Sequence, residues 1–451
     1  MSRTKGLGLS TTQIIMLSFL VTIFIGSILL SLPISWAEDN HVGYIDALFT
    51  ATTATCVTGL VTVTTATAWS GFGQAVILIL IQIGGLGIIT IMSGLMILIN
   101  KKMGIGDRLL VQDAFNLNTL SGLTVFIKKV LLGTFVIEGI GALLYMTVFV
   151  PEFGIRGVWI SVFNAVSAFC NAGMDVIGEN SLYDYATNPI VNGTTIALIV
   201  LGGIGYVVWW DILRVAGDKG KRKRGFRNLT LHSKIAILTS VILILLGTAV
   251  MLALEYNNPL TLGGKNLFDK LQIALFQSVT TRTAGFASVP QDSLTDSSAI
   301  ASMFLMLVGG SPVGTAGGIK TVTLTVLIAS AIATVKGKDE VTLFDRTVSK
   351  TAVEKSATVC TVFVGIAMIS TLLLSIAEGA PLIDILYETI SATATVGLTR
   401  GITPTLGIAG KIIIIATMYL GRVGPISLAL ALSGKKRQNI IKNPVEDISV
   451  G

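Results

Sequence analysis

The sequence predicts an all-α polytopic membrane protein, in which four helix–pore-loop–helix repeats surround a pseudo-fourfold pore. Three observations lead to this prediction. The 451 residues are 52% hydrophobic and only 13% charged, whereas soluble domains carry about 25% charged residues. Eight apolar segments reach the roughly 20 residues that a helix needs to cross a bilayer. Between them, a short semi-apolar motif that ends in glycine recurs four times.

The eight apolar segments are approximately residues 13–32, 75–99, 130–150, 190–210, 235–254, 302–335, 357–377 and 412–432. Five of them contain no charged residue, and the exceptions are Glu138, Lys320 and Arg422. The first segment follows Arg3 and Lys5, as the apolar part of a signal peptide would. Its apolar run is longer than a typical signal sequence, which favours a retained helix. We therefore expect eight transmembrane helices with four re-entrant pore helices between them.

Charge patterning predicts the orientation in a cell membrane. Of the 32 Lys and Arg residues, 24 lie in the N-terminus, the tail and alternate loops, so this side is cytoplasmic by the positive-inside rule. Both termini are then cytoplasmic. The basic run 221–224 fits a topology determinant or a contact for acidic membrane lipids or a partner. The opposite side carries 14 acidic and six basic residues, and either forms a mouth that attracts cations or is simply solvated.

The four copies of the short motif end at Gly59, Gly173, Gly285 and Gly397, at intervals of 114, 112 and 112 residues. Such regularity over the whole chain indicates an internal repeat. The third copy is one residue shorter between its aromatic residue and its glycine. The predicted units are repeat 1 (1–105), repeat 2 (106–217), repeat 3 (218–340), repeat 4 (341–434) and a cytoplasmic tail (435–451).

The residues before each glycine are small or β-branched and can form one short pore helix, after which glycine allows an unusual backbone conformation. Non-helical backbone at membrane depth must be buried in protein or line a water-filled cavity. Four such segments would present rings of carbonyl oxygens, as in a potassium filter, with helix C-termini that favour a cation. Glycines used only for helix packing would explain one copy but not four in matching contexts.

The candidate K+-binding residues are Thr55, Cys56, Val57, Thr58, Gly59, Cys170, Asn171, Ala172, Gly173, Arg282, Thr283, Ala284, Gly285, Ala394, Thr395, Val396 and Gly397. Cys56 and Cys170 share one position, three residues before the glycine, and are interpreted as small packing residues. The three cysteines and two histidines match no disulfide framework and no metal-ligand spacing.

The second helix of repeat 3 departs from the others, because Pro312 and five glycines in ten residues cannot sustain an uninterrupted helix. A broken helix at membrane depth must line a cavity, so we predict an intramembrane gating loop over 309–320. Its candidate residues are Gly309, Gly310, Ser311, Pro312, Val313, Gly314, Thr315, Ala316, Gly317, Gly318 and Lys320, together with Arg422. A phosphate-binding P-loop is excluded, because the glycines are not followed by Gly-Lys-Ser/Thr and no strand precedes them.

The charged residues within the apolar segments need a partner or a function. Lys320 and Arg422 would act as an electrostatic barrier to cations or would pair with carbonyl or carboxylate groups to hold the gate shut. Glu138 is either a partner for another helix or a satisfied structural carboxylate.

The sequence resembles the Trk/Ktr/HKT superfamily of cation transporters, and most closely the membrane subunit of Ktr-type bacterial potassium uptake systems. The resemblance covers nearly the whole chain and is specific at Thr283-Ala284-Gly285-Phe286, at the loop 314–321 and at the segment 420–425. It implies a filter at and before the four glycines, a gate at the loop 309–318, and Arg422 beside that gate. The presence of glycine in all four filter segments resembles the pattern of the potassium-selective branch of this superfamily.

The resemblance also implies a homodimer that binds a cytosolic ring of nucleotide-sensing, KtrA-like subunits. It implies K+ as the transported ion and Na+ as a stimulating ion. No nucleotide-binding motif occurs in this chain, so nucleotide control would come from the partner, and no nucleic-acid partner is expected. The expected function is gated potassium uptake.

Two other classes remain as alternatives. A coupled secondary transporter with alternating access also uses broken helices near the midplane, but it predicts two pseudosymmetric halves rather than four like repeats. A membrane enzyme is not expected, since the apolar segments contain no nucleophile–base pair and no metal cluster.

Overall fold

A computed structural model of the chain describes residues 11–38, 40–99, 104–114, 122–218 and 225–424. This described part is mostly helical, and its strands are β1 (Thr342–Leu343) and β2 (Arg346–Thr347), which pair as a short hairpin. Several sequence predictions fall outside the described residues. They concern Arg3, Lys5, the basic run 221–224, the last part of the eighth apolar segment (425–432) and the tail 435–451.

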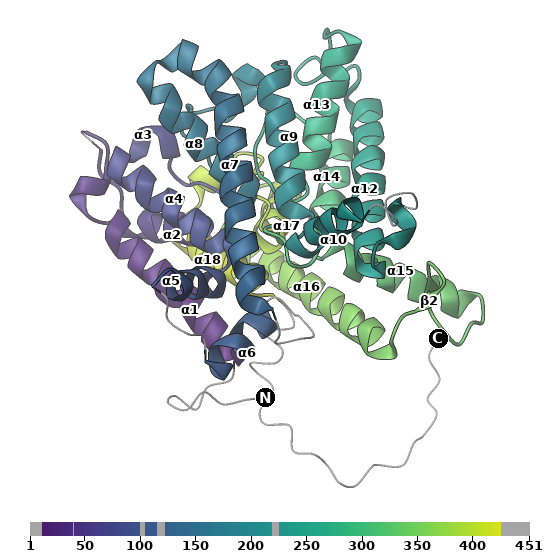
Figure 1. Cartoon of the computed structure of the whole chain (residues 1–451). Coiled ribbons are helices and arrows are strands. Elements are labelled where there is room, and N and C mark those ends of the chain that lie inside the picture. The colour runs from purple at the N-terminus through teal and green to yellow at the C-terminus, as the bar shows by residue number, and fades with distance from the viewer. Residues whose placement is uncertain (1–10, 39, 100–103, 115–121, 219–224, 425–451) are drawn as a thin grey trace.

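Four long helices form the outer wall of the molecule (Figure 1). They are α1 (Thr11–Leu30), α7 (Leu123–Phe153), α12 (Leu231–Glu255) and α16 (Lys350–Ala377). At 1.5 Å per residue, even the shortest is about 30 Å long, which matches the hydrocarbon core of a bilayer. Their apolar side chains face outward, for example Leu132, Leu245 and Met368, which are 68%, 63% and 61% exposed. A surface of this kind is stable in lipid rather than in water.

Four shorter helices follow the outer helices and end inside the molecule. These pore helices are α2 (Tyr44–Cys56), α8 (Ile155–Cys170), α13 (Leu267–Thr280) and α17 (Leu382–Ala394). They have 13 to 16 residues and are too short to cross a bilayer. Their last turns are buried, so each pore helix ends in the protein interior.

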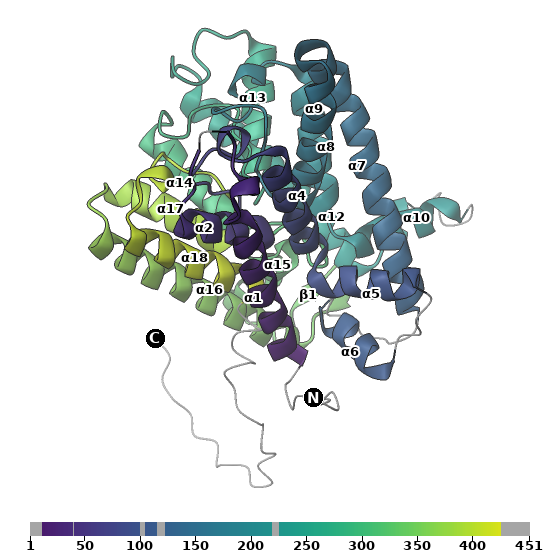
Figure 2. The same ribbon diagram turned by 90° about the vertical axis from the view of Figure 1, so that its left-hand side faces the viewer.

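The inner helices complete the repeats, and most of them are broken. They comprise α4 (Gly71–Leu86) with α5 (Ile88–Leu98), α9 (Pro189–Gly203) with α10 (Tyr206–Gly217), α14 (Asp296–Leu307) with α15 (Thr321–Val335), and α18 (Ile408–Val423). The short helices α3 (Thr65–Ala68) and α6 (Ile105–Ala114) lie in connections. Figures 1 and 2 show α5 running across the upright direction of α7.

The sequence predicts a broken inner helix in repeat 3, and this prediction is too narrow. The pairs α4–α5 and α9–α10 each bend by 95°. The bends occur at Gly87 and Gly205, whose φ angles are +83° and +94°, a region that L-residues avoid. The predicted segments 75–99 and 190–210 are therefore not straight helices.

The described residues contain four helices that are individually long and apolar enough to span a membrane, and six spans if each bent pair counts as one. In repeat 3, the loop 308–320 separates α14 from α15, as predicted. The helix α18 ends at Val423, next to the end of the described residues.

The pore and inner helices form a closed ring. Each pore helix packs against the inner helix of the preceding repeat, in the pairs α8–α4, α13–α9, α17–α14 and α2–α18. Contact between α2 and α18 joins the first repeat to the last, so the four repeats surround a common axis. This is the pseudo-fourfold, all-α fold that the sequence predicts.

Candidate functional site

The backbone turns in the same way after all four pore helices. The residue two positions before each motif glycine is left-handed, with φ between 52° and 67° at Val57, Asn171, Thr283 and Thr395. The glycines also have positive φ angles, of 98°, 65°, 82° and 96° in chain order. A left-handed L-residue costs about 1–2 kcal/mol, and such strain is kept where the surrounding structure enforces it, often at functional sites. We call Gly59, Gly173, Gly285 and Gly397 the filter glycines.

The filter glycines lie against one another in a closed ring. A Cβ added to Gly59 would lie 2.5 Å from Ala172 O, and one added to Gly173 would lie 2.5 Å from Ala284 O. A Cβ added to Gly285 would meet Val396 O, and one added to Gly397 would meet Thr58 O. Each repeat therefore contacts the carbonyl before the next filter glycine, in the order 1, 2, 3, 4 and back to 1. No side chain fits at these positions without moving the backbone of a neighbouring repeat.

Hydroxyl side chains hold these turns, and the sequence analysis missed them. Gly59 N–H donates to Thr53 Oγ1 (2.9 Å), and Gly397 N–H donates to Ser391 Oγ (3.0 Å). Ser167 occupies the same position in repeat 2 and accepts from Met174 N–H (3.1 Å). In repeat 3, Thr280 Oγ1 donates to Phe286 O (2.5 Å).

A sequence signal for these hydroxyls existed. A Ser or Thr precedes the filter glycine by six residues in three copies and by five in the shorter third copy.

The predicted filter residues are brought together, with one side chain directed elsewhere. All of them except the half-buried Gly173 are buried, and most are small. Arg282 is also buried, but its guanidinium donates to Ser240 Oγ (3.2 Å) on α12 and to Gly309 O (3.1 Å) at the start of the gating loop. The Arg282 side chain thus lies behind the filter and contacts the loop.

Glycines in the inner helices allow close contact with the ends of the pore helices. An added Cβ at Gly84, Gly202 or Gly421 would meet the carbonyl oxygen of Thr55, Phe169 or Thr393, respectively. Each of these carbonyls lies four residues before its filter glycine. The repeated contact sets the depth of three of the four pore helices.

Replacing Gly84 by alanine is expected to destabilise the protein by about 1–3 kcal/mol, as other insertions into packed interiors do. The new methyl group would lie 2.9 Å from Val57 Cγ2 and still closer to backbone atoms of Thr55. Thermal unfolding in detergent measures the effect. Gly139→Ala on α7 is the matched control, because nothing lies within 4 Å of its added Cβ. Equal unfolding temperatures for the two variants would show that the contact does not constrain α2.

A cavity of about 180 Å³ lies over the filter and is lined by all four filter glycines. The carboxyl groups of Asp175 and Glu179 also line it. Burial raises the pKa of Asp175 to about 6, although hydrogen bonds from the backbone of Ile177 and Gly178 and from Ser181 favour its charged form. This cavity lies where the sequence predicts the mouth of a filter, and acidic residues at such a place would attract cations.

The loop predicted to be a gate, residues 308–320 and called the gating loop below, lies against the C-terminal ends of the pore helices α8, α13 and α17. Within it, Gly309 N–H donates to Ile319 O (3.0 Å), which closes the loop on itself. Its contacts with repeat 2 are Ser311 N–H to Gly203 O (2.8 Å) and Thr315 Oγ1 to Phe169 O (3.0 Å).

The loop also contacts repeats 3 and 4. Gly317 N–H donates to Thr283 Oγ1 (3.1 Å), and a Cβ added to Gly317 would meet Thr395 Oγ1. The loop therefore touches residues next to three of the four filter glycines.

Two positively charged side chains within the membrane, those of Arg422 and Lys320, hold this loop by donating hydrogen bonds to carbonyl oxygens. Arg422 Nη1 donates to Thr315 O (2.7 Å), and its Nη2 donates to Gly84 O on the inner helix of repeat 1. Lys320 Nζ donates to Ala316 O and to Gly317 O within the loop itself. Arg422 thus links repeats 1 and 4 to a loop that belongs to repeat 3.

Glu138 has a partner on another helix, as one of its two expected roles requires. Gln82 Nε2 on α4 donates to Glu138 Oε2 (3.3 Å) on α7, and Cys170 Sγ lies 3.6 Å from Gln82 Oε1. The Sγ atom of Cys170 also packs against Gly85 and would lie 2.6 Å from a Cβ atom added to that glycine. This buried polar group joins repeats 1 and 2 behind the filter. No cluster of three or more His, Cys, Asp or Glu residues suited to a metal occurs in the described part of the chain.

A ring of pore helices and strained glycine turns below an acidic mouth, inside an apolar wall, defines a membrane cation transport protein. Residues 9–442 match the TrkH family, described as a cation transport protein. The chain belongs to this family, whose members are transporters and not enzymes, and it is a membrane protein.

Similar proteins cover nearly the whole chain. It is 39% identical to the Ktr system potassium uptake protein B of Bacillus subtilis, over 97% of this chain and 96% of that protein. It is also 39% identical to the potassium/sodium uptake protein NtpJ of Enterococcus hirae, over 98% of both. The crystal structure of the potassium transporter TrkH from Vibrio parahaemolyticus aligns with a TM-score of 0.75 at 16% identity, over 96% of this chain and 87% of that one. The last comparison shows the shared fold.

Proposed function

We propose that the chain takes up potassium ions through a filter of backbone carbonyl oxygens at and before the four filter glycines. The closed ring of these glycines carries the proposal, because it brings the carbonyls of Thr58, Ala172, Ala284 and Val396 to one axis. Carbonyl oxygens replace the hydration shell of K+ in such filters. The pore helices end at this ring, and their partly negative C-termini favour a cation.

The gating loop closes the path below the filter, and Arg422 and Lys320 hold it there. The loop side, with the termini, faces the cytoplasm, and the acidic cavity faces outward. This orientation rests on the basic residues of the loops.

The proposed assembly is a homodimer with a cytosolic ring of nucleotide-sensing, KtrA-like subunits. Relatives named as parts of a Ktr system support a partner subunit. Na+ is proposed to stimulate uptake, in line with the name of the E. hirae relative. The rival function, alternating access in a coupled secondary transporter, fits less well with four repeats that close into one ring.

The proposal predicts that cells deficient in potassium uptake regain growth at low K+ when they express this chain with a cytosolic ring subunit. Uptake of K+ into these cells is the measurement, made with and without the ring subunit and with and without Na+. The chain alone is expected to give weaker uptake, because the gating loop stays closed. Membrane-inserted protein that gives no K+ uptake under any of these conditions would overturn the function.

Ion flux into the same cells distinguishes a pore from a carrier. A pore gives flux that follows the electrochemical gradient and single-channel currents in bilayers. Flux that saturates at low K+ with strict coupling to a second ion would support the secondary transporter instead.

A further inference from the structure

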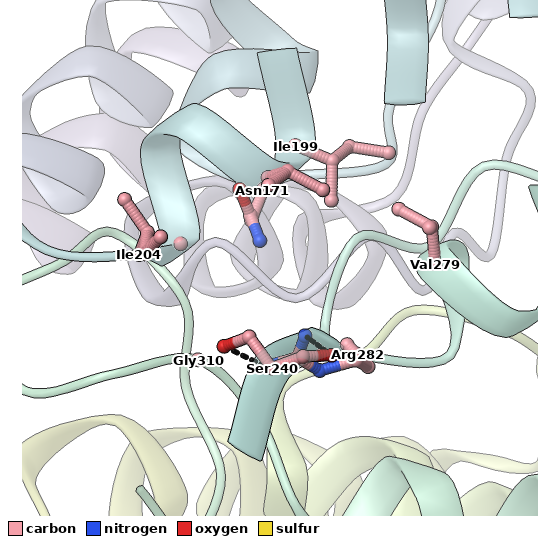
Figure 3. Close-up of a pocket in the computed structure, with 9 residues that line it drawn as sticks. Asn171, Ile199, Ile204, Ser240, Val279, Arg282 and Gly310 are labelled. Atoms are coloured by element: carbon pink, nitrogen blue, oxygen red, sulfur yellow. Dashed lines mark hydrogen bonds between the residues drawn. The ribbon is translucent and has the colours of Figure 1, made fainter. Parts of the chain in front are cut away.

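A small cavity lies between the filter turns of repeats 2 and 3 and the gating loop (Figure 3). Its volume is about 20 Å³. Apolar side chains of α9 and α13 form much of its wall, among them Ile199 and Val279. The polar lining comes from Asn171, Ser240 and Arg282. A cavity that holds a water molecule needs roughly 10–15 Å³, so this one has room for a single small molecule.

Two buried hydrogen-bond donors at this cavity have no protein acceptor among the described residues. They are Nδ2 of Asn171, which is 1% exposed, and Nε of Arg282, which is 7% exposed. Figure 3 shows the Asn171 amide nitrogen pointing across the cavity toward Ser240 and Arg282. Leaving a buried donor unpaired costs about 1–3 kcal/mol, and buried polar groups of this kind are usually satisfied by ordered water.

The remaining atoms of these two side chains are fixed by the gating loop. The Thr315 hydroxyl shares its single proton between Phe169 O (3.0 Å) and Asn171 Oδ1 (3.3 Å), and this contact with Oδ1 leaves Nδ2 for the cavity. Arg282 Nη2 donates to Gly309 O (3.1 Å) and to Ser240 Oγ (3.2 Å), so its Nε is held at the cavity edge. Both donors therefore face the same space because both side chains bind the loop.

We propose that the cavity holds one ordered water molecule that accepts hydrogen bonds from Asn171 Nδ2 and Arg282 Nε. The water completes a chain of hydrogen bonds, called the circuit below, that runs from Gly309 through Arg282, the water and Asn171 to Thr315. This circuit connects two filter turns to the gating loop. A displacement of the loop that breaks either end frees a filter side chain, so the position of the loop influences the filter geometry.

A water molecule is favoured over an anion by the surroundings of the guanidinium. Arg282 already binds the oxygens of Gly309 and Ser240, including Ser240 O (3.4 Å). These dipoles stabilise its charge without a counter-ion. The carbonyl rings of the neighbouring filter turns also disfavour an anion nearby. A chloride ion remains the competing occupant that the experiment distinguishes.

The first test is a density map of the full chain with its assembly partners, at a resolution that shows ordered water, in KCl and in KBr. The expected result is one peak at 2.7–3.2 Å from both nitrogens, with no anomalous bromide signal. An empty cavity or a bromide peak overturns the proposal. This test uses the unchanged protein, so it does not depend on how any variant folds.

The second test is a double-mutant cycle with Asn171→Leu and Arg282→Met, read out as the ratio of K+ to Na+ uptake. Both changes remove the donors and keep most of the side-chain volume. If one water joins the two residues, the double variant loses about as much selectivity as the worse single variant, within roughly twofold. Losses that multiply show that the residues act independently and overturn the bridge. Thr53→Val paired with Arg282→Met is the control cycle, for which multiplied losses are expected, because Thr53 holds the filter turn of repeat 1 and does not line this cavity.

Discussion

Replacing Gly173 by serine is expected to reduce the preference for K+ over Na+ by about tenfold or more, which corresponds to about 1.4 kcal/mol of lost discrimination. An added Cβ at this position would lie 2.5 Å from Ala284 O and 2.6 Å from Gly285 Cα. The φ angle of +65° adds strain of about 1–2 kcal/mol for any L-residue. Relief requires the filter turns of repeats 2 and 3 to separate, which would move their carbonyl oxygens out of the positions in which we propose that they replace the hydration shell of K+.

Competitive uptake of K+ and Na+ measures the effect. Gly285→Ser is expected to act in the same way, because its Cβ would meet Val396 O in repeat 4. Gly193→Ser on α9 provides the matched control, since an added Cβ there has nothing within 4 Å. If Gly173→Ser transports with the selectivity of this control, the filter glycines do not line the ion path.

The ring explains why the positions of the four glycine turns were predictable from the sequence. Each filter glycine contacts the backbone of the next repeat, and each turn needs a positive φ angle, so no other residue fits at four matching positions. Four glycines at nearly equal spacing and in matching contexts are therefore visible without a structure. The contact order around the ring is not visible, because spacing along the chain does not show which repeats are neighbours.

The breaks at Gly87 and Gly205 were missed for a related reason. Apolar composition predicts that a segment lies in the membrane, but it does not show whether that segment is straight. The pattern Gly84-Gly85-Leu86-Gly87 recurs as Gly202-Gly203-Ile204-Gly205. The first glycine of the pattern packs against a pore helix, and the last one bends the chain. The sequence alone does not distinguish these two roles.

The role of Arg282 was also hidden in the sequence. Its place within the third filter copy predicts a filter residue, whereas its side chain binds α12 and the gating loop. The missing residue in that copy alters the turn after Thr280, and only the three-dimensional path shows where the long side chain goes. Arg422 was predicted beside the gate, but its contact with Gly84 O depends on the packing of repeats 1 and 4.

Loosening the gating loop is expected to raise K+ flux in the absence of any cytosolic partner. Arg422→Gln removes the guanidinium that binds Thr315 O and Gly84 O. A hydrogen bond from a charged group contributes about 1.5–3 kcal/mol, so its loss shifts an open–closed equilibrium by roughly ten- to more than a hundredfold. Deletion of residues 312–316 is expected to have a larger effect, because it also removes the contacts of Thr315 with Gly202 and Phe169.

Flux of K+ into proteoliposomes that contain only this chain is the direct measurement. Arg346→Gln is the control, since Arg346 is exposed on the short hairpin of β1 and β2. Thermal unfolding must show that each variant remains folded. The sign of the flux change is decisive, because a loop that only supports the filter would lower flux and selectivity together when loosened. A loop that blocks the path raises basal flux when it is loosened. The sign of the flux change, rather than the ion preference, separates the two roles, because the loop also contacts Asn171 and Arg282 of the filter turns.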